Sequence, residues 1–188
     1  KTLRKHQEEA IQAVRAGLEK NDRGKLIMAC GTGKTLTALR LAEAIVPHSG
    51  SVLFLAPSIF LVSQTLREWT AEAFNPFRAF VVCSDTKVGK ENEDIRTHDL
   101  AYPATTNAKS LADGINLSLK DKNAEDASTG RNTKADATNQ RTIVFSTYQS
   151  IQTVINAQKE HGIGVFDLVI CDEAHRTTGV TLKGETTS

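Results

Sequence analysis

The chain has 188 residues, of which 39% are hydrophobic and 24% are charged, and its formal net charge at pH 7 is +1. This composition is that of an ordinary globular domain with enough residues to bury a core, and it excludes a disordered or collagen-like chain. The charge near zero excludes a strongly basic coat for nucleic acid, but it leaves room for local contacts with a phosphate backbone. No apolar stretch of about 18 residues and no N-terminal signal region occurs, so we expect no membrane segment.

Three cysteines, Cys30, Cys83 and Cys171, each lie in or beside an apolar run. No two of them have a spacing typical of metal ligands, so a zinc site is not expected. We interpret them as buried, reduced thiols, which predicts a cytoplasmic protein.

Apolar strand patterns alternate along the chain with amphipathic helix patterns. The first helix has Ile11, Val14 and Leu18 at helical spacing, and the strands are short apolar runs bounded by glycine, proline or polar residues. This alternation predicts an α/β fold with a mostly parallel sheet, helices on both faces and right-handed crossovers. In chain order we predict helix 5–20, strand 25–30, helix 36–45, strand 51–56, helix 60–74, strand 78–83, strand 142–146, helix 149–159 and strand 166–171.

Residues 84–140 interrupt this alternation. They contain 10 acidic and 8 basic residues, and residues 120–141 have no apolar side chain larger than alanine. We predict a polar insertion at 84–140 within a single domain spanning 1–188, and a flexible surface loop at 120–141. Between the two polar stretches, Leu111 and Ile115 predict a short helix that begins after the turn at 103–107.

The strongest local motif is the glycine-rich run from Gly31 to Thr35, between a predicted strand and a predicted helix. Gly31, Thr32 and Gly33 would let backbone N–H groups converge on a phosphate, and the helix N-terminus favours an anion. Lys34 would reach the terminal phosphates, and the Thr35 hydroxyl would bind Mg²⁺. The strict phosphate-loop pattern begins with a glycine where this chain has methionine. The alternative interpretation is an ordinary glycine turn before a helix.

A second motif follows the last predicted strand. A nucleotide hydrolase needs one carboxylate at a strand end to hold Mg²⁺ and another to deprotonate the attacking water. Asp172 suits the first role and Glu173 the second, so Thr35 and Asp172 are the predicted metal ligands. The alternative is an exposed acidic strand end without chemistry.

Together, the loop and the Asp172-Glu173-Ala174-His175 string resemble the first RecA-like lobe of superfamily 2 helicases and translocases, over nearly the whole chain. The resemblance implies a RecA-like P-loop NTPase fold, ATP and Mg²⁺ as cofactors, and Lys34, Asp172, Glu173 and His175 as catalytic residues. It makes His175 a link between the nucleotide site and the nucleic-acid track, whereas a lone histidine is otherwise structural or solvated.

The N-terminal run Leu3-Arg4-Lys5-His6-Gln7 resembles the glutamine motif of the same family. The resemblance implies that Gln7 reads the adenine edge, for which an amide has suitable donor and acceptor atoms, and that Arg4 belongs to the same nucleotide site. Without the resemblance, Gln7 would be a solvated residue on a helix.

Three further segments resemble the backbone-binding motifs of the family. The first of them, at Pro57-Ser58, directly follows a predicted strand, at the sheet edge where ligands of α/β folds gather. The alternative interpretation of their hydroxyl groups is helix capping and turn formation. The residues implied to contact nucleic acid are Pro57, Ser58, Gln64, Thr105, Thr106 and Thr147.

The residues that make up these motifs are most similar to those in the motor domains of restriction–modification enzymes, including single-polypeptide enzymes and type I and III subunits. This implies ATP-driven movement along duplex DNA, with a second RecA-like lobe C-terminal in the same protein. An Asp-Glu-Ala-His RNA helicase and a nucleotide hydrolase without a track remain as alternatives, because backbone motifs read phosphate rather than base. The family's Ser/Thr-Ala-Thr coupling motif is expected after the Asp-Glu-Ala-His string, but it does not occur after His175 in this sequence.

Overall fold

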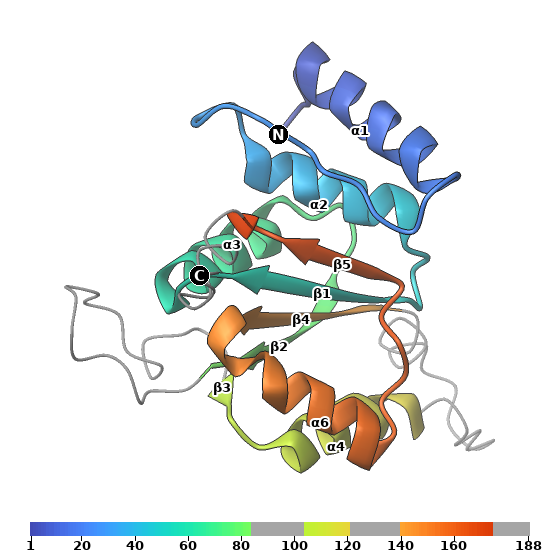
Figure 1. Ribbon diagram of the computed structural model, residues 1–188, viewed down its shortest axis with the longest axis vertical. Helices are drawn as coiled ribbons and strands as arrows, with labels where there is room; N and C mark the ends of the chain where they lie inside the picture. The colour runs from blue at the N-terminus through green and yellow to red at the C-terminus, as the bar shows by residue number, and fades with distance from the viewer. Residues whose placement is uncertain (84–103, 121–139, 175–188) are drawn as a thin grey trace, which may run out of the picture.

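A computed structural model describes residues 1–83, 104–120 and 140–174, and Figure 1 shows its arrangement. Five strands form one parallel sheet in the order β3-β2-β4-β1-β5. The elements are α1 (Lys5–Leu18), α2 (Lys34–Ile45), β1 (Ser51–Ala56), α3 (Ile59–Glu72), β2 (Phe77–Val82), β3 (Ala104–Thr105), α4 (Ala108–Lys120), β4 (Arg141–Thr147), a 3-10 turn η3 (Tyr148–Ser150), α6 (Ile151–His161) and β5 (Leu168–Cys171).

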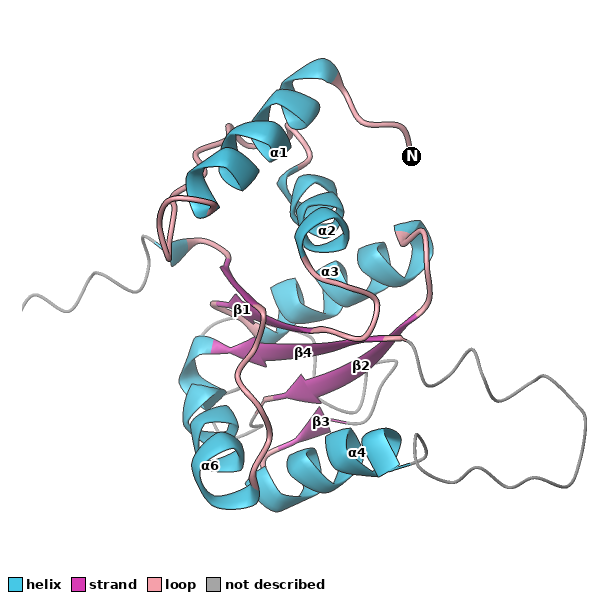
Figure 2. Ribbon diagram, turned by 90° about the vertical axis from the view of Figure 1, so that its right-hand side faces the viewer, coloured by secondary structure: helices cyan, strands magenta, loops and turns pink. Residues whose placement is uncertain are grey.

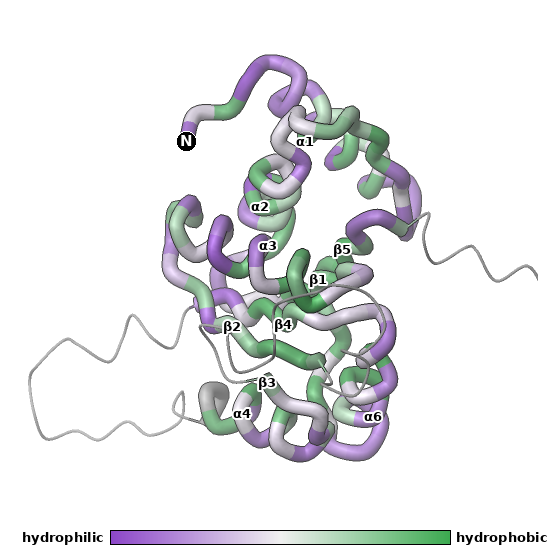
Figure 3. Tube along the Cα trace, turned by 90° about the vertical axis from the view of Figure 1, so that its left-hand side faces the viewer, coloured by the Kyte–Doolittle hydropathy of each residue, from purple (hydrophilic) through white to green (hydrophobic). Residues whose placement is uncertain are grey.

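The prediction of a parallel sheet with helices on both faces is confirmed. Helices α2 and α3 cover one face of the sheet, and α4 and α6 cover the other (Figures 1 and 2). Strands β1 and β4 lie in the middle and are almost entirely buried, which explains why their sequences are continuously apolar rather than alternating. Figure 3 shows this as a band of hydrophobic residues through the centre of the molecule.

An aromatic cluster fills the α2–α3 face of the sheet. The indole of Trp69 is fully buried, and its ring centroid lies 5.4 Å from that of Phe54 and 5.5 Å from that of Phe145, both in edge-to-face geometry. Trp69 also donates a hydrogen bond from its indole N–H to the Thr35 carbonyl oxygen, 3.0 Å away. The centre of the core is thereby bonded to the first turn of α2.

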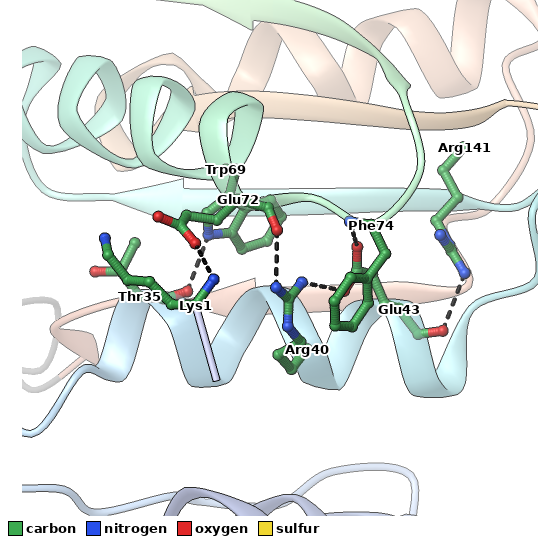
Figure 4. Close-up of polar contacts among 8 residues, drawn as sticks. All are labelled: Lys1, Thr35, Arg40, Glu43, Trp69, Glu72, Phe74 and Arg141. Carbon is green, nitrogen blue, oxygen red and sulfur yellow. Dashed lines mark hydrogen bonds and ion pairs between the residues drawn. The ribbon is translucent and has the colours of Figure 1, made fainter. Parts of the chain in front are cut away.

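A second set of contacts fixes the other end of α2, and Figure 4 shows it. The buried guanidinium of Arg40 pairs with Glu43, donates to the Glu72 carbonyl oxygen and stacks on the Phe74 ring, 3.5 Å from its centroid. Arg141, at the start of β4, donates to the Glu43 carbonyl oxygen at 3.0 Å. Cations and donors satisfy the free carbonyls of a helix C-terminus, so α2 is held in a defined direction against α3 and β4.

Residues 104–120, the main described part of the predicted insertion 84–140, are not an insertion but belong to the fold itself. The helix predicted after residue 107 is confirmed as α4, and its Leu111 and Ile115 are buried against the sheet together with Val82. Strand β3 also belongs to the sheet. Strand β3 was missed because two residues are too few to give an apolar pattern, and the polar sequences on either side of α4 hid its place in the fold.

The boundaries of the predicted flexible loop 120–141 are wrong at both ends. Lys120 is the last residue of α4, and Arg141 begins β4 with its side chain buried. Polar composition does not reveal that a long cationic side chain will cap a helix across the fold. Residues 121–139 lie outside the described residues.

The predicted buried strand at residues 25–30 is also wrong. The segment is not a strand, and its Leu26 and Ile27 side chains are 41% and 81% exposed. A strand exists only when a neighbour pairs with its backbone, and among the described strands β5, at the nearer edge of the sheet, pairs with β1 alone. An apolar run therefore did not suffice to form a strand here.

Of the three cysteines, Cys83 is buried as predicted, but Cys30 and Cys171 are exposed. The reason is that Cys30 lies in the segment that does not join the sheet, and Cys171 lies at the end of an edge strand. No helix in the described parts of the chain has the length and apolar character needed to cross a membrane.

Candidate nucleotide site and sheet edge

The glycine-rich loop enters α2 in the conformation that its glycines allow. Gly31 and Gly33 have φ angles of +76° and +85°, in the left-handed region that L side chains disfavour. Gly33 is the N-cap of α2 and brings no side chain to the free amides of the first turn. Those amides remain available to an anion, as a phosphate cradle requires.

Gln7 lies beneath this loop and is only 3% exposed. Its side-chain nitrogen donates to the carbonyl oxygens of Thr32 at 3.1 Å and Gly33 at 3.3 Å, and its side-chain oxygen accepts from the Arg4 backbone N–H at 2.8 Å. A Cβ on Gly33 would lie 2.5 Å from that nitrogen, so any other residue there would displace the Gln7 amide from its hydrogen bonds. The Gln7 amide thus holds the loop, while Arg4 is exposed at the start of α1.

The loop and the acidic motif meet although they lie far apart in the sequence. Lys34 Nζ is 3.1 Å from Glu173 Oε1 across 139 residues, and this hydrogen bond raises the pKa of the Lys34 ammonium. Partial burial, followed by the charge of Glu173, raises the pKa of the Asp172 carboxyl. The predicted catalytic residues Lys34, Asp172 and Glu173 therefore form one cluster with the loop, whereas His175 lies outside the described residues.

Asp172 and Glu173 follow β5 in a tight backbone turn. The Asp172 N–H donates to the Leu55 carbonyl oxygen on β1 at 2.8 Å, which extends the sheet pairing by one residue. The next N–H, that of Glu173, donates to Asp172 Oδ1 at 3.0 Å. Glu173 has a φ of +50° and is the one non-glycine residue with positive φ among those described. Such a conformation persists only where surrounding bonds hold it.

Residues in the cluster suit a magnesium–nucleotide complex better than a metal held by protein alone. Within the described part of the chain, no three His, Cys, Asp or Glu side chains gather into a metal site. Mg²⁺ commonly takes one or two protein carboxylates and completes its shell with phosphate oxygens and water. One carboxylate at Asp172 and one hydroxyl at Thr35, beside a phosphate cradle, fit that requirement.

Most of the predicted nucleic-acid residues lie at the same edge of the sheet as Asp172. In the parallel register Ala56 pairs with Thr147 and Val82 pairs with Thr105, so the strands end side by side. Pro57 and Ser58 follow the end of β1 directly. The structure therefore brings three of the predicted segments to one edge.

The hydroxyl groups at this edge have local partners, as the capping and turn interpretation expects. Ser58 Oγ accepts from the Leu61 N–H and caps α3, and Thr147 Oγ1 donates to Ser150 Oγ at 3.1 Å while 5% exposed. Thr105 Oγ1 accepts from the Asn107 N–H at 3.0 Å. The remaining two predicted residues differ in setting, since Thr106 is exposed and Gln64 donates to Glu68 within α3.

Sequence reasoning missed one residue of this region, Tyr148. It directly follows β4, and its hydroxyl donates to the Asp172 carbonyl oxygen at 2.8 Å. Burial raises the pKa of the Tyr148 phenol, so it remains a donor at neutral pH. The only sequence signal was its place beside Thr147 in the Ser-Thr-Tyr-Gln run, which does not reveal a contact with a residue 24 positions away.

The proteins similar to this chain include two solved structures and one curated protein. A nuclease-deletion mutant of the Type ISP restriction-modification enzyme LlaGI, in complex with a DNA substrate mimic, is 38% identical with a TM-score of 0.69 and matches 93% of this chain and 15% of that one. The ATP-dependent Type ISP restriction-modification enzyme LlaBIII bound to DNA is 38% identical with a TM-score of 0.77 and matches 96% and 11%. A probable helicase of African swine fever virus (isolate Tick/Malawi/Lil 20-1/1983) is 28% identical over 177 residues, 94% of this chain and 16% of that protein.

The chain thus spans a small part of the length of these relatives. Its fold is the RecA-like fold of restriction-enzyme helicase domains, with the phosphate loop, Asp172 and Glu173 gathered at one edge of the sheet. The sequence model described as type III restriction enzyme, res subunit, matches residues 1–184. The chain belongs to this helicase-type family of restriction enzyme subunits.

Proposed function

We propose that this chain is the ATP-binding and ATP-hydrolysing lobe of a DNA translocase, the motor of a cytoplasmic restriction–modification enzyme that moves on duplex DNA. The observation that supports it most is the contact of Lys34 with Glu173 at 3.1 Å, which joins the phosphate loop to the acidic motif. If these segments were only a glycine turn and an exposed acidic strand end, nothing would favour a hydrogen bond between Lys34 and Glu173.

Each residue of the cluster has a role that its position supports. Bound Mg²⁺·ATP would supply the phosphoanhydride bond and a cation that neutralises charge on the phosphates. The α2 amides and Lys34 would hold the phosphates, and Thr35 and Asp172 the metal. Without nucleotide, Lys34 neutralises Glu173; when Lys34 turns to a phosphate, the Glu173 carboxylate is released to accept a proton from water.

The DNA track and the second lobe are further parts of the proposal. The two solved relatives are bound to DNA or to a DNA substrate mimic, which favours DNA over RNA as the track. Because the hydroxyls of Ser58 and Thr147 have local partners, backbone contact at this edge requires either an exchange of those bonds or the use of neighbouring amides. We assign His175 the link to the track, and Gln7 the support of the loop with reading of adenine as its predicted second role.

The catalytic assignment is tested by separating the two carboxylates in the intact motor, the protein in which a second lobe follows this chain. Glu173→Gln should leave Mg²⁺·ATP binding nearly unchanged and reduce turnover by about 10²–10⁴, because the base is lost. Asp172→Asn should weaken binding of the Mg²⁺ complex itself. Equal loss of binding in both variants would show that the two roles are assigned wrongly.

The division of the site between two lobes is tested with residues 1–188 alone. An arginine finger that stabilises charge on the γ-phosphate is worth about 10³–10⁵ in rate, and the resemblance to superfamily 2 motors implies that the second lobe provides it. The isolated chain should therefore bind nucleotide weakly, hydrolyse it barely and respond little to DNA. Turnover near 1 s⁻¹, an ordinary enzyme rate, with clear stimulation by DNA would contradict the proposed division.

The track is tested by comparing polymers in the intact motor. Duplex DNA should stimulate hydrolysis more than single-stranded RNA of equal length at the same salt concentration. Greater stimulation by RNA would favour the RNA helicase alternative, and no stimulation by either would favour a hydrolase without a track.

A further inference from the structure

We infer that Tyr148 is a positioning residue for ATP hydrolysis, which holds the Asp172–Glu173 peptide and through it both carboxylates of the site. The inference rests on the proposed function. It adds a residue that lies in neither the glycine-rich loop nor the Asp172-Glu173 motif. It follows from the hydrogen bond of the Tyr148 hydroxyl to the Asp172 carbonyl oxygen, at 2.8 Å.

The two sides of the Asp172–Glu173 peptide are both hydrogen bonded. Tyr148 holds its C=O, and Asp172 Oδ1 accepts from its N–H at 3.0 Å. Glu173 has a φ of +50°, which a flip of this peptide would return toward the negative range that L residues prefer. A flip would also take the N–H away from Asp172 Oδ1. The Tyr148 hydroxyl therefore opposes the flip and preserves the bond that orients the Asp172 carboxylate.

The position of Tyr148 in the chain connects this peptide to the predicted DNA edge. Tyr148 begins the 3-10 turn that follows β4, and its neighbour Thr147 is bonded to Ser150 of the same turn. A backbone contact that shifts this turn would displace the phenol, and the displacement would reach the Asp172 carbonyl through a single hydrogen bond. No chain of intermediate side chains is needed.

The tyrosine ring and hydroxyl are suited to this task. The ring packs against the α4–α6 face of the core, which fixes its direction, and the hydroxyl reaches the end of β5. Phenylalanine can keep the ring packing and remove only the donor. Tyr148→Phe is thus a narrow change.

The first test uses residues 1–188 without nucleotide and follows amide hydrogen exchange at Glu173 by NMR. Tyr148→Phe should speed exchange at this amide by roughly two- to tenfold, the size expected for the loss of one hydrogen bond. Thr70→Val is the matched control, since Thr70 Oγ1 also donates to a backbone carbonyl at 2.8 Å, within α3. Unchanged exchange at Glu173 in Tyr148→Phe, or equal acceleration in the control, would overturn the inference.

The second test measures turnover in the intact motor. Tyr148→Phe should lower kcat for DNA-stimulated hydrolysis roughly ten- to a hundredfold, as loss of a residue that orients a metal ligand does, and should raise the Mg²⁺ concentration needed for half activity. The melting temperature should change no more than in Thr70→Val. A loss confined to stability, with kcat and Mg²⁺ dependence unchanged, would leave Tyr148 purely structural. Failure of the wild type to hydrolyse ATP would instead refute the proposed function, and the exchange test would still stand.

Discussion

The α2–α3 face of the sheet and the approach to the phosphate loop differ in how they are held. In the first, Trp69 and Phe145 are fully buried and contact each other at 5.5 Å between ring centroids. In the second, residues 21–30 are exposed apart from Met28, and Ile27 reaches 81% exposure. The acidic half of the site continues a sheet strand, whereas the loop half depends on a few hydrogen bonds from Gln7 and on the start of α2.

This difference teaches where stability and function can be separated. Close-packed interior side chains resist any change of volume, so substitutions in the aromatic cluster should act on the whole fold. Hydrogen bonds around a glycine loop contribute less each, so substitutions there should act on nucleotide binding first.

Removing the central indole should cost the most. Trp69→Ala should lower the free energy of unfolding by about 3–5 kcal/mol, the usual cost of truncating a large buried aromatic. Urea denaturation followed by circular dichroism measures it, with Trp69→Phe as the smaller truncation, which keeps one aromatic ring but removes the indole N–H that bonds Thr35. A cost below about 1 kcal/mol in Trp69→Ala would mean that the cluster is not the centre of stability.

Removing the loop lysine should affect binding and spare the fold. Lys34→Ala should reduce affinity for Mg²⁺·ATP by a few kcal/mol, because the phosphates lose their cationic partner. The free energy of unfolding should change by less than about 1 kcal/mol, because the Lys34–Glu173 pair is partly exposed. Calorimetric titration decides the first point and denaturation the second. Equal affinity in both forms would refute the phosphate-loop assignment.

The Gln7 amide separates support of the loop from recognition of the base. Gln7→Ala should weaken ATP binding by roughly 1 kcal/mol, since loop hydrogen bonds are lost. If Gln7 only supports the loop, ATP and GTP should weaken alike. If Gln7 also reads adenine, ATP should weaken more than GTP, and the ratio of the two dissociation constants measures this directly.

The smallest effect is expected in the exposed approach. Ile27→Ser should change the free energy of unfolding by no more than about 0.5 kcal/mol, as exposed substitutions usually do. Ile143→Val, which removes one methylene from the centre of β4, should cost about 0.5–1.5 kcal/mol. A cost for Ile27→Ser that equals or exceeds that of Ile143→Val would show that the Ile27 side chain is buried in solution and would contradict the separation of the two regions.

The sequence by itself determined the features that depend on neighbouring residues. The apolar runs at 51–56 and 142–146 predicted β1 and β4, and Gly31 and Gly33 predicted a loop that only glycine can form at those φ angles. Leu111 and Ile115 predicted α4 by spacing alone. Periodicity and backbone freedom are local properties, so they can be read without the fold.

Tertiary structure decided what depends on partners far along the chain. Whether residues 25–30 form a strand depends on a neighbour to pair with, and whether Gln7 faces adenine or the loop depends on the Thr32 and Gly33 carbonyls that accept its amide. The bond from Tyr148 to Asp172 likewise exists only because β4 and β5 lie on either side of β1 in one sheet. A hydrogen-bond donor has the same sequence signature whichever acceptor it meets, and only the packing of the strands brings a particular acceptor within reach.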